Sequence, residues 1–159
     1  MCFNKDLISL PKLNLPELEI KIKKDDDVLQ VFDEIRRIWL KLTPEEWVRQ
    51  NFLKYLKLYK KYPSGLIAIE FSVKYGKLTK RPDAVIYSKN NNPLVIIEFK
   101  APTVKITNDV FLQAFMYNSQ LGVDLFFVSN GLEHYACRVN HINKNIEFFE
   151  DIPFYDDLD

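Results

Sequence analysis

Two carboxylates and a lysine in the middle of the chain have the types and spacing that phosphodiester hydrolysis needs. Asp83 follows a proline, and after fourteen intervening residues comes the triplet Glu98-Phe99-Lys100. The carboxylates and the Phe99 carbonyl offer hard oxygen ligands to Mg²⁺, which can bridge to a phosphate. Lys100 falls on the same strand face as Glu98, where an ammonium could orient the attacking water. We interpret these residues as a candidate metal-dependent hydrolytic centre.

A carboxylate-x-lysine triplet is weak support when taken alone. In a chain this rich in charge about two are expected by chance, and Glu19-Ile20-Lys21 is a second one. Only Glu98 follows an apolar run, Leu94–Ile97, and only Glu98 has an aspartate that can reach it across a predicted hairpin. This context favours the triplet at Glu98.

The hairpin that joins these residues needs an irregularity. A turn centred on Asn91 places Asp83 opposite Phe99, one residue away from Glu98 and from Lys100. Side chains alternate between the two faces of a strand, so a one-residue register shift or a bulge is required to bring all three to one face. We predict that irregularity.

Gln113 and Tyr117 add a polar pair to the candidate centre. They lie four residues apart in a predicted helix and therefore share one helix face. Taken singly, each has an ordinary interpretation, as a surface glutamine and a tyrosine at the edge of the core. Their functional interpretation depends on their coincidence with the three charged residues.

Hydrophobic periodicity predicts two helices before the hairpin. From about Asp27 to Leu42, apolar residues recur at intervals of three and four, which favours a helix with one buried face. A second helix should begin at Thr43-Pro44-Glu45-Glu46, which has a cap residue, a proline at the first position and a glutamate at the third. It should end near Lys60.

The remainder predicts strands around one more helix. Alternation predicts a strand from Leu66 to Val73, followed by the hairpin strands Asp83–Ser88 and Leu94–Lys100. A helix over Thr107–Leu121 should stop at Gly122. Three strands should follow, over Val123–Ser129, His134–Asn140 and Ile146–Phe149. The order ααβββαβββ predicts an α/β fold with a mixed central sheet flanked by helices.

Length and composition predict a single globular domain over residues 1–159. Hydrophobic residues make up 47% of the chain and charged residues 28%, a balance that excludes disordered and fibrous classes. Residues 1–26 are expected to form an N-terminal arm and residues 151–159 an acidic tail. No apolar run is long enough to cross a bilayer and no leader pattern is present, so we expect a cytoplasmic protein without membrane contact.

The charge is unevenly distributed although the net charge is zero. Nine basic residues and one acid lie between Trp47 and Pro82, whereas six acids and no base follow Lys144. Two explanations of this basic segment are equally good: it forms a surface that faces a polyanion, or it is the ordinary solvated surface of a helix. The candidates for DNA-backbone contacts in this segment are Arg49, Lys54, Lys57, Lys80 and Arg81.

The cysteines and histidines carry no recognisable site. Cys2 and Cys137 lack a C-x-x-C spacing, which argues against a zinc or redox site. His134 and His141 lie seven residues apart, and neither is expected to act as a ligand or base. No other cofactor is indicated.

The sequence resembles a known family, the N-terminal nuclease domain of type I restriction enzyme R subunits, within the PD-(D/E)xK superfamily. The resemblance covers roughly residues 28–150. The segments that carry it are Thr43-Pro44-Glu45-Glu46-Trp47-Val48-Arg49, Ile69-Glu70, Lys80-Arg81-Pro82-Asp83, Ile97-Glu98-Phe99-Lys100-Ala101-Pro102 and Gln113-Ala114-Phe115-Met116-Tyr117.

The resemblance implies a restriction-endonuclease-like fold and a Mg²⁺- or Mn²⁺-dependent endonuclease that acts on DNA. Asp83 and Glu98 would then bind the metal, and Lys100 would be the catalytic lysine. Gln113 and Tyr117 would sit beside the active site and help to position the substrate backbone. Glu70 would occupy the place of an additional acid near the metal.

The chain also departs from this family. Members are usually fused to an ATP-driven translocase, and these 159 residues contain no Gly-x-x-x-x-Gly-Lys-Ser/Thr phosphate loop. A homodimer, or other subunits of a restriction, defence or mobile-element system, would be the partners besides DNA. Two alternatives remain: a non-catalytic nucleic-acid binding or assembly module with the nuclease fold, and an interaction domain in which Asp83, Glu98 and Lys100 form only an ion-pair cluster.

Overall fold

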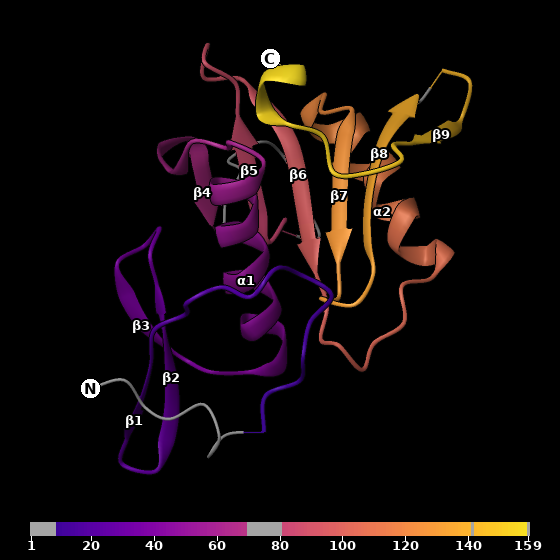
Figure 1. The fold of residues 1–159 in the computed structure, drawn as a ribbon. Coiled ribbons are helices and arrows are strands. Elements are labelled where there is room, and N and C mark those ends of the chain that lie inside the picture. The colour runs from indigo at the N-terminus through magenta and orange to yellow at the C-terminus, as the bar shows by residue number, and fades with distance from the viewer. Residues whose placement is uncertain (1–8, 70–80, 141, 159) are drawn as a thin grey trace.

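The computed structural model describes residues 9–69, 81–140 and 142–158, which form two sheets, two α-helices and two short 3₁₀ helices, Ser64–Leu66 and Tyr155–Asp157 (Figure 1). The larger sheet has six strands in the order β4-β5-β6-β7-β8-β9. Their bounds are Ile67–Ile69, Ala84–Tyr87, Pro93–Phe99, Leu125–Ser129, His134–Asn140 and Asn145–Phe148. The pair β6–β7 is parallel and the other four neighbouring pairs are antiparallel. The predicted mixed sheet is confirmed.

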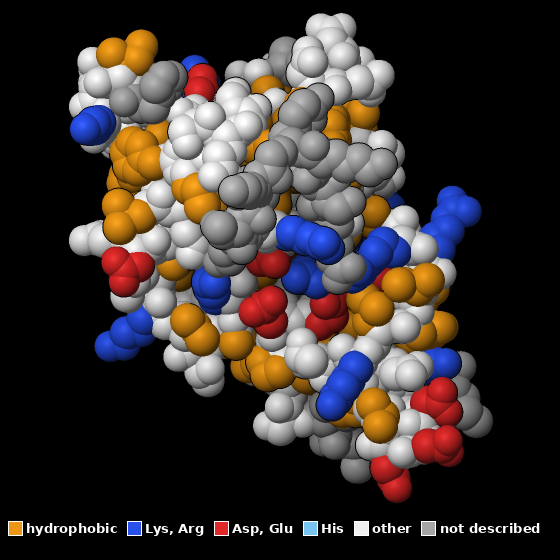
Figure 2. Space-filling view, turned by 180° about the vertical axis from the view of Figure 1, so that it is seen from behind, with side chains coloured by type: hydrophobic (Ala, Val, Ile, Leu, Met, Phe, Trp, Pro, Cys, Tyr) orange, Lys and Arg blue, Asp and Glu red, His pale blue; other side chains and the backbone are white. Residues whose placement is uncertain are grey.

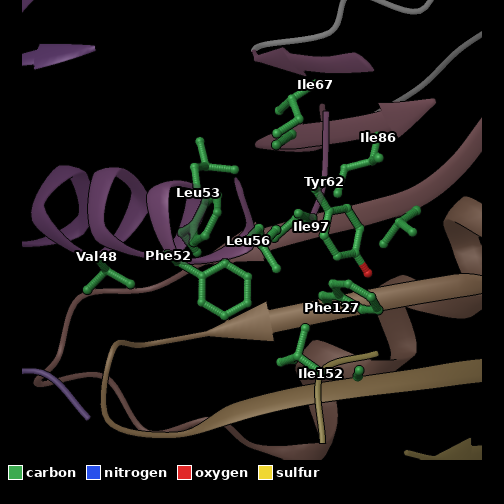
Figure 3. Close-up of a cluster of buried hydrophobic side chains, with 14 of the residues drawn as sticks. Val48, Phe52, Leu53, Leu56, Tyr62, Ile67, Ile86, Ile97, Phe127 and Ile152 are labelled. Carbon is green, nitrogen blue, oxygen red and sulfur yellow. The ribbon is translucent and has the colours of Figure 1, made fainter. Parts of the chain in front are cut away.

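Two helices cover opposite faces of this sheet. α1 (Pro44–Tyr59) buries Val48, Phe52 and Leu56 against one face, where the alternate strand residues Ile86, Ile97 and Phe127 point (Figure 3). α2 (Asn108–Leu121) packs on the residues of opposite parity, including Val85 and Ile96. The result is a three-layer α/β arrangement with apolar side chains on both faces of the sheet. Within the described residues, neither helix is long and apolar enough to cross a membrane.

The predicted start of α1 is confirmed in atomic detail. Thr43 precedes the helix in an extended conformation, and its hydroxyl accepts a hydrogen bond from the Glu46 N–H at 3.1 Å. Pro44 occupies the first helical turn, where a missing N–H costs nothing. The Glu46 carboxylate turns instead toward Arg49 and Gln50. Of the two hydrogen bonds of a capping box, Thr43 and Glu46 therefore form the one to the Thr43 hydroxyl, while the Glu46 carboxylate is engaged elsewhere.

The helix predicted over Asp27–Leu42 is wrong, because these residues belong to a separate antiparallel sheet. Its strands are β1 (Ile22–Asp25), β2 (Val28–Asp33) and β3 (Ile38–Lys41). Asp26 and Asp27 both have positive φ, as a two-residue type I′ hairpin turn requires. The observed order is therefore βββαβββαβββ rather than ααβββαβββ. β1 also begins within the range predicted as an N-terminal arm.

The other predicted elements agree with the structure to within a few residues. Gly122 ends α2 with a left-handed conformation, φ +67°. The strand predicted over Leu66–Val73 is observed at Ile67–Ile69, and its remainder lies outside the described residues.

The two ends of the described chain dock onto the core. Leu13 is 9% exposed, and the next residue, Asn14, donates its backbone N–H to the Gly131 carbonyl. The acidic segment after residue 150 buries Ile152 and Tyr155 on the α1 face of the sheet. These contacts add apolar cover beyond that of α1.

Candidate functional site

The register of β5 and β6 brings Asp83 beside Glu98. Ala84 pairs with Ile97 and Val85 with Ile96, and the register shifts between Ile86 and Tyr87. Continuing the pairing by one residue places Asp83 opposite Glu98. Val85 and Ile96 belong to the cluster under α2, so Asp83 and Glu98 fall on that same side by alternation. The predicted register irregularity is confirmed, and it lies at the loop end of the hairpin.

Glu98 is a buried carboxylate held from α2. Its exposed fraction is 1%, and the Tyr117 hydroxyl donates a hydrogen bond to Oε1 at 2.7 Å. Tyr117 is buried to the same degree and stacks on Phe126 with ring centroids 6.4 Å apart. Burial first, and then the bond to Glu98, raises the pKa of Tyr117 above its ordinary value. Tyr117 therefore serves as a fixed hydrogen-bond donor to Glu98.

Asp83 caps the end of the hairpin with its side chain. Oδ2 accepts a hydrogen bond from the Phe99 backbone N–H at 2.8 Å, immediately beyond the last β5–β6 pair. Oδ1 lies 3.6 Å from Nη2 of Arg49. Asp83 is thus fixed from both sides, by the strand that carries Glu98 and by a residue of α1.

The first turns of α1 supply a charged network next to Asp83. Arg49 is 7% exposed, lies over the Phe99 ring, and donates from Nη1 to Glu46 at 2.7 Å. Its Nη2 is 3.7 Å from Glu45 and 3.6 Å from Asp83, so one guanidinium nitrogen lies between two carboxylates. Burial, followed by the charge of Asp83, raises the pKa of Glu45.

This network was not predicted from the sequence. The segment that carries Glu45 and Glu46 was interpreted as a helix start and as part of the family resemblance, and Arg49 as a DNA-backbone contact. The helix start and Asp83 are far apart in the sequence, so no spacing pattern joins them. Only the packing of α1 on the sheet brings them together.

Lys100 follows β6 on the same side as Glu98. Its backbone N–H donates to the Ser129 carbonyl at 2.9 Å, and its side chain is partly exposed. Its charge acts on Glu45, which places it near the start of α1. Among the described residues, Lys100 forms no ion pair with Asp83 or Glu98. Figure 2, which views the molecule from behind relative to Figure 1, shows acidic and basic side chains close together in the middle of the face in view.

The other predicted site residues are distributed differently. Gln113 is partly buried one helical turn before Tyr117. Arg81 is exposed, and Lys54 and Lys57 share Glu34, at 2.8 Å and 3.6 Å. Arg49 is buried among carboxylates rather than exposed for a phosphate contact. The predictions for Glu70 and Lys80 lie outside the described residues.

His134, at the start of β8, connects the sheet to the N-terminal segment. Its Nδ1 is 2.7 Å from the Ser129 hydroxyl and its Nε2 is 2.8 Å from the Asn14 carbonyl, so it ties the N-terminal segment to the sheet. Burial lowers the pKa of His134. The prediction for His141 lies outside the described residues.

The donor atoms at this site fit a hard divalent cation. Asp83 and Glu98 supply carboxylate oxygens from adjacent strand ends, and the Phe99 carbonyl follows Glu98 directly in the chain. Within the described ranges, no group of three or more acidic, histidine or cysteine side chains could hold a metal. Mg²⁺ does not need such a cage, since it is commonly bound by one or two carboxylates and several waters.

Comparison with known proteins gives the same fold and a family. A family model described as the N terminus of the type I restriction enzyme R protein matches residues 44–153. A solved fragment of a protein described as an HsdR subunit of a type I restriction enzyme from Vibrio vulnificus YJ016 is similar in structure, with a TM-score of 0.52 and 18% identity. The similarity covers 74% of this chain and 24% of that chain, so this chain spans about a quarter of it. A search of curated proteins found no match. The restriction-endonuclease-like fold class is confirmed.

Proposed function

The chain belongs to the family of type I restriction enzyme R protein N termini, and from that premise we propose that it hydrolyses phosphodiester bonds of DNA at Asp83, Glu98 and Lys100. The observation that carries the proposal is the β5–β6 register, which sets Asp83 beside Glu98 at the strand end where Lys100 follows. A register one residue different would send the two carboxylates to opposite faces.

Asp83, Glu98 and the Phe99 carbonyl would hold a Mg²⁺ or Mn²⁺ ion. When bound, such an ion polarises a phosphoryl oxygen and lowers the pKa of a bound water. The protein keeps the two carboxylates in place beforehand. Tyr117 fixes Glu98 through Oε1, and the Phe99 N–H fixes Asp83 through Oδ2. Arg49 offsets part of the negative charge beside Asp83.

Lys100 would act on the water and the phosphate. It stands on the Glu98 side of the strand without an ion pair to either carboxylate among the described residues. An ammonium in this position can orient a water for attack and stabilise charge that develops on phosphoryl oxygens. The ion-pair interpretation of the three residues would require Lys100 to be engaged with the carboxylates. Its placement favours catalysis over that interpretation.

Gln113 and Tyr117 would have unequal roles. Tyr117 is buried and engaged with Glu98, so we assign it to positioning of the carboxylate rather than to contact with substrate. Gln113, one turn earlier and partly exposed, remains the better candidate for contact with the DNA backbone. Other subunits of a restriction system would be the partners besides DNA.

The test is cleavage of plasmid and linear DNA by the purified chain with Mg²⁺ or Mn²⁺. Asp83→Ala and Lys100→Ala should abolish a metal-dependent nicking activity, whereas Lys105→Ala, an exposed lysine five residues away, should retain it. Thermal unfolding of each variant controls for loss of fold. Metal binding without cleavage would point to a missing partner subunit. The absence of both metal binding and DNA cleavage would refute the proposal.

A further inference from the structure

One face of the small β1–β3 sheet carries aromatic rings and lysines side by side. Phe32 pairs with Trp39 across β2 and β3, and their ring centroids are 5.2 Å apart. Lys21 Nζ lies 5.6 Å from the Phe32 centroid, and Lys23 Nζ lies 4.7 Å from the Trp39 centroid. By strand alternation these four side chains share one face, to which Lys41 and one acid, Asp25, 3.9 Å from Lys23, also belong.

This face is not the one that the sheet buries most deeply. Val31 and Asp33, on the opposite face of β2, are both 0% exposed. Trp39 is 38% exposed, although a tryptophan is usually well buried. Aromatic rings that alternate with lysines on an open sheet face are the arrangement that binds single-stranded nucleic acid, because bases stack on the rings and phosphates meet the ammonium groups.

The same face continues into a pocket of about 170 Å³ between β2 and α1. Phe32, Ile35, Leu53 and Ile67 give the pocket apolar walls. Its charged lining residues are the bases Lys21, Arg37, Lys54 and Lys57 and a single acid, Glu34. Apolar walls under a mostly basic rim suit a flat, partly apolar group that carries negative charge, as a nucleotide does.

We propose that this pocket and the Phe32–Trp39 face bind an unpaired stretch of single-stranded DNA. One base would enter the pocket against Phe32, a neighbouring base would lie against Trp39, and the phosphates would run along Lys21, Lys23 and the basic rim. Paired bases stay stacked inside a duplex and expose only their edges, so an unpaired strand is the form that fits.

The choice of DNA rests on the proposed nuclease function. Helix α1 connects the pocket to the candidate catalytic site. Gln50 lines the pocket and donates to Glu46 at 2.8 Å, and Glu46 binds Arg49, which lies beside Asp83. From Leu53 in the pocket to Glu45 at the candidate site the helix rises about 12 Å. That distance corresponds to about three or four nucleotides at the rise of a duplex strand. The pocket would therefore present a strand to the catalytic carboxylates.

The first experiment uses the two tryptophans of the chain as an internal reporter. In Trp47→Phe, Trp39 is the only tryptophan left. Titration with an oligothymidylate of twelve nucleotides, in EDTA and low salt, should quench its fluorescence saturably. The Trp47→Phe substitution removes a buried side chain and its hydrogen bond to the Pro11 carbonyl. Binding is therefore also measured by anisotropy of a labelled oligonucleotide with protein that keeps Trp47.

Variants on the two faces of the sheet provide matched controls. Trp39→Ala should weaken binding by about five-fold or more, the loss expected for one stacked base, whereas Ile38→Ala, on the opposite face, should change it less than about two-fold. Lys21→Glu with Lys23→Glu should weaken binding by about ten-fold or more and reduce its dependence on salt. Lys24→Glu, an exposed lysine on the other face of β1, should leave it unchanged.

Three results would overturn the proposal: no saturable quenching, equal affinity for a duplex of the same length, or quenching as strong with a polyglutamate peptide, which would indicate an acidic protein partner. The assay contains no metal, so its outcome is independent of cleavage. Binding that persists in Asp83→Ala while native protein cuts no DNA would refute the nuclease and keep this site. Metal-dependent cleavage without oligothymidylate binding would support the nuclease and refute the single-strand binding site.

Discussion

The hydrogen bond from Tyr117 to Glu98 should contribute strongly to the stability of the protein. Both side chains are 1% exposed, and the bond is 2.7 Å long. A hydrogen bond to a charged group contributes about 1.5–3 kcal/mol, and a buried carboxylate that loses a donor pays a desolvation penalty. Tyr117→Phe removes only the hydroxyl. We therefore expect the free energy of unfolding at pH 7 to fall by about 1.5–3 kcal/mol, and Tm by about 3 to 12 °C.

A double-mutant cycle measures this interaction directly. Urea unfolding of Tyr117→Phe, Glu98→Gln and the double variant, without metal, gives a coupling energy, which we expect to be about 1.5 kcal/mol or more. Tyr135→Phe is the matched control, since the described structure gives its hydroxyl no hydrogen bond, and its effect should add to that of Glu98→Gln. Additive effects of Tyr117→Phe and Glu98→Gln would refute the assignment of Tyr117 as the residue that positions Glu98.

Three further changes test other parts of the account. Arg49→Met should lower the free energy of unfolding by about 3 kcal/mol, because it removes the cation paired with the buried Glu46 and the partly buried Asp83. It should also impair cleavage by releasing Asp83; native activity in a folded variant would contradict this. Burial alone would raise the pKa of Asp33, but hydrogen bonds from Arg36 lower it below 3.8. The ionised Asp33 therefore stabilises the fold above pH 3.8, and this stabilisation is lost as the pH falls through the folded-state pKa. Asp33→Asn should flatten the pH dependence of the urea unfolding midpoint below pH 3.8. An unchanged pH profile would contradict this role of Asp33. Gly131→Ala should lower the urea midpoint by an amount equivalent to about 1–3 kcal/mol, because φ is +85° and the new Cβ would lie 2.6 Å from Leu13; an unchanged midpoint would disprove the clash.

The segments that the sequence predicted well have strong local signals. α1 begins at a cap residue followed by a proline, and α2 ends at Gly122, so backbone chemistry alone marks these boundaries. The β5–β6 hairpin was predicted together with its register shift. That prediction followed from the requirement that Asp83 and Glu98 share a face, which a hairpin of regular register could not satisfy.

The error over residues 27–42 has a physical explanation. The apolar positions of two short antiparallel strands joined by a loop happened to fall at helical intervals. In the structure Val31 lies opposite Leu40 and Phe32 opposite Trp39, on different faces. The signal for strands was the acidic turn at Asp26, which lacks the usual asparagine or glycine and was therefore weak.

The geometry of the candidate site was predictable only where its residues are close in sequence. Asp83, Glu98 and Lys100 belong to one hairpin, and local geometry relates them. Glu45 and Arg49 come from a helix that precedes the hairpin, and tertiary packing alone brings them to Asp83. The engagement of Tyr117 with Glu98 also needed coordinates, because helical spacing gives the face of a residue but not its partner.

The most direct test of the account is to locate the metal. Fe²⁺ can replace Mg²⁺ in such sites, and with ascorbate and peroxide it generates radicals that cut the polypeptide next to the bound ion. We expect cuts close to Asp83 and to Glu98–Phe99, suppressed by excess Mg²⁺ and absent from Asp83→Ala. Cuts elsewhere in the chain, or cuts at these positions that persist in Asp83→Ala, would contradict a metal centre formed by these two carboxylates.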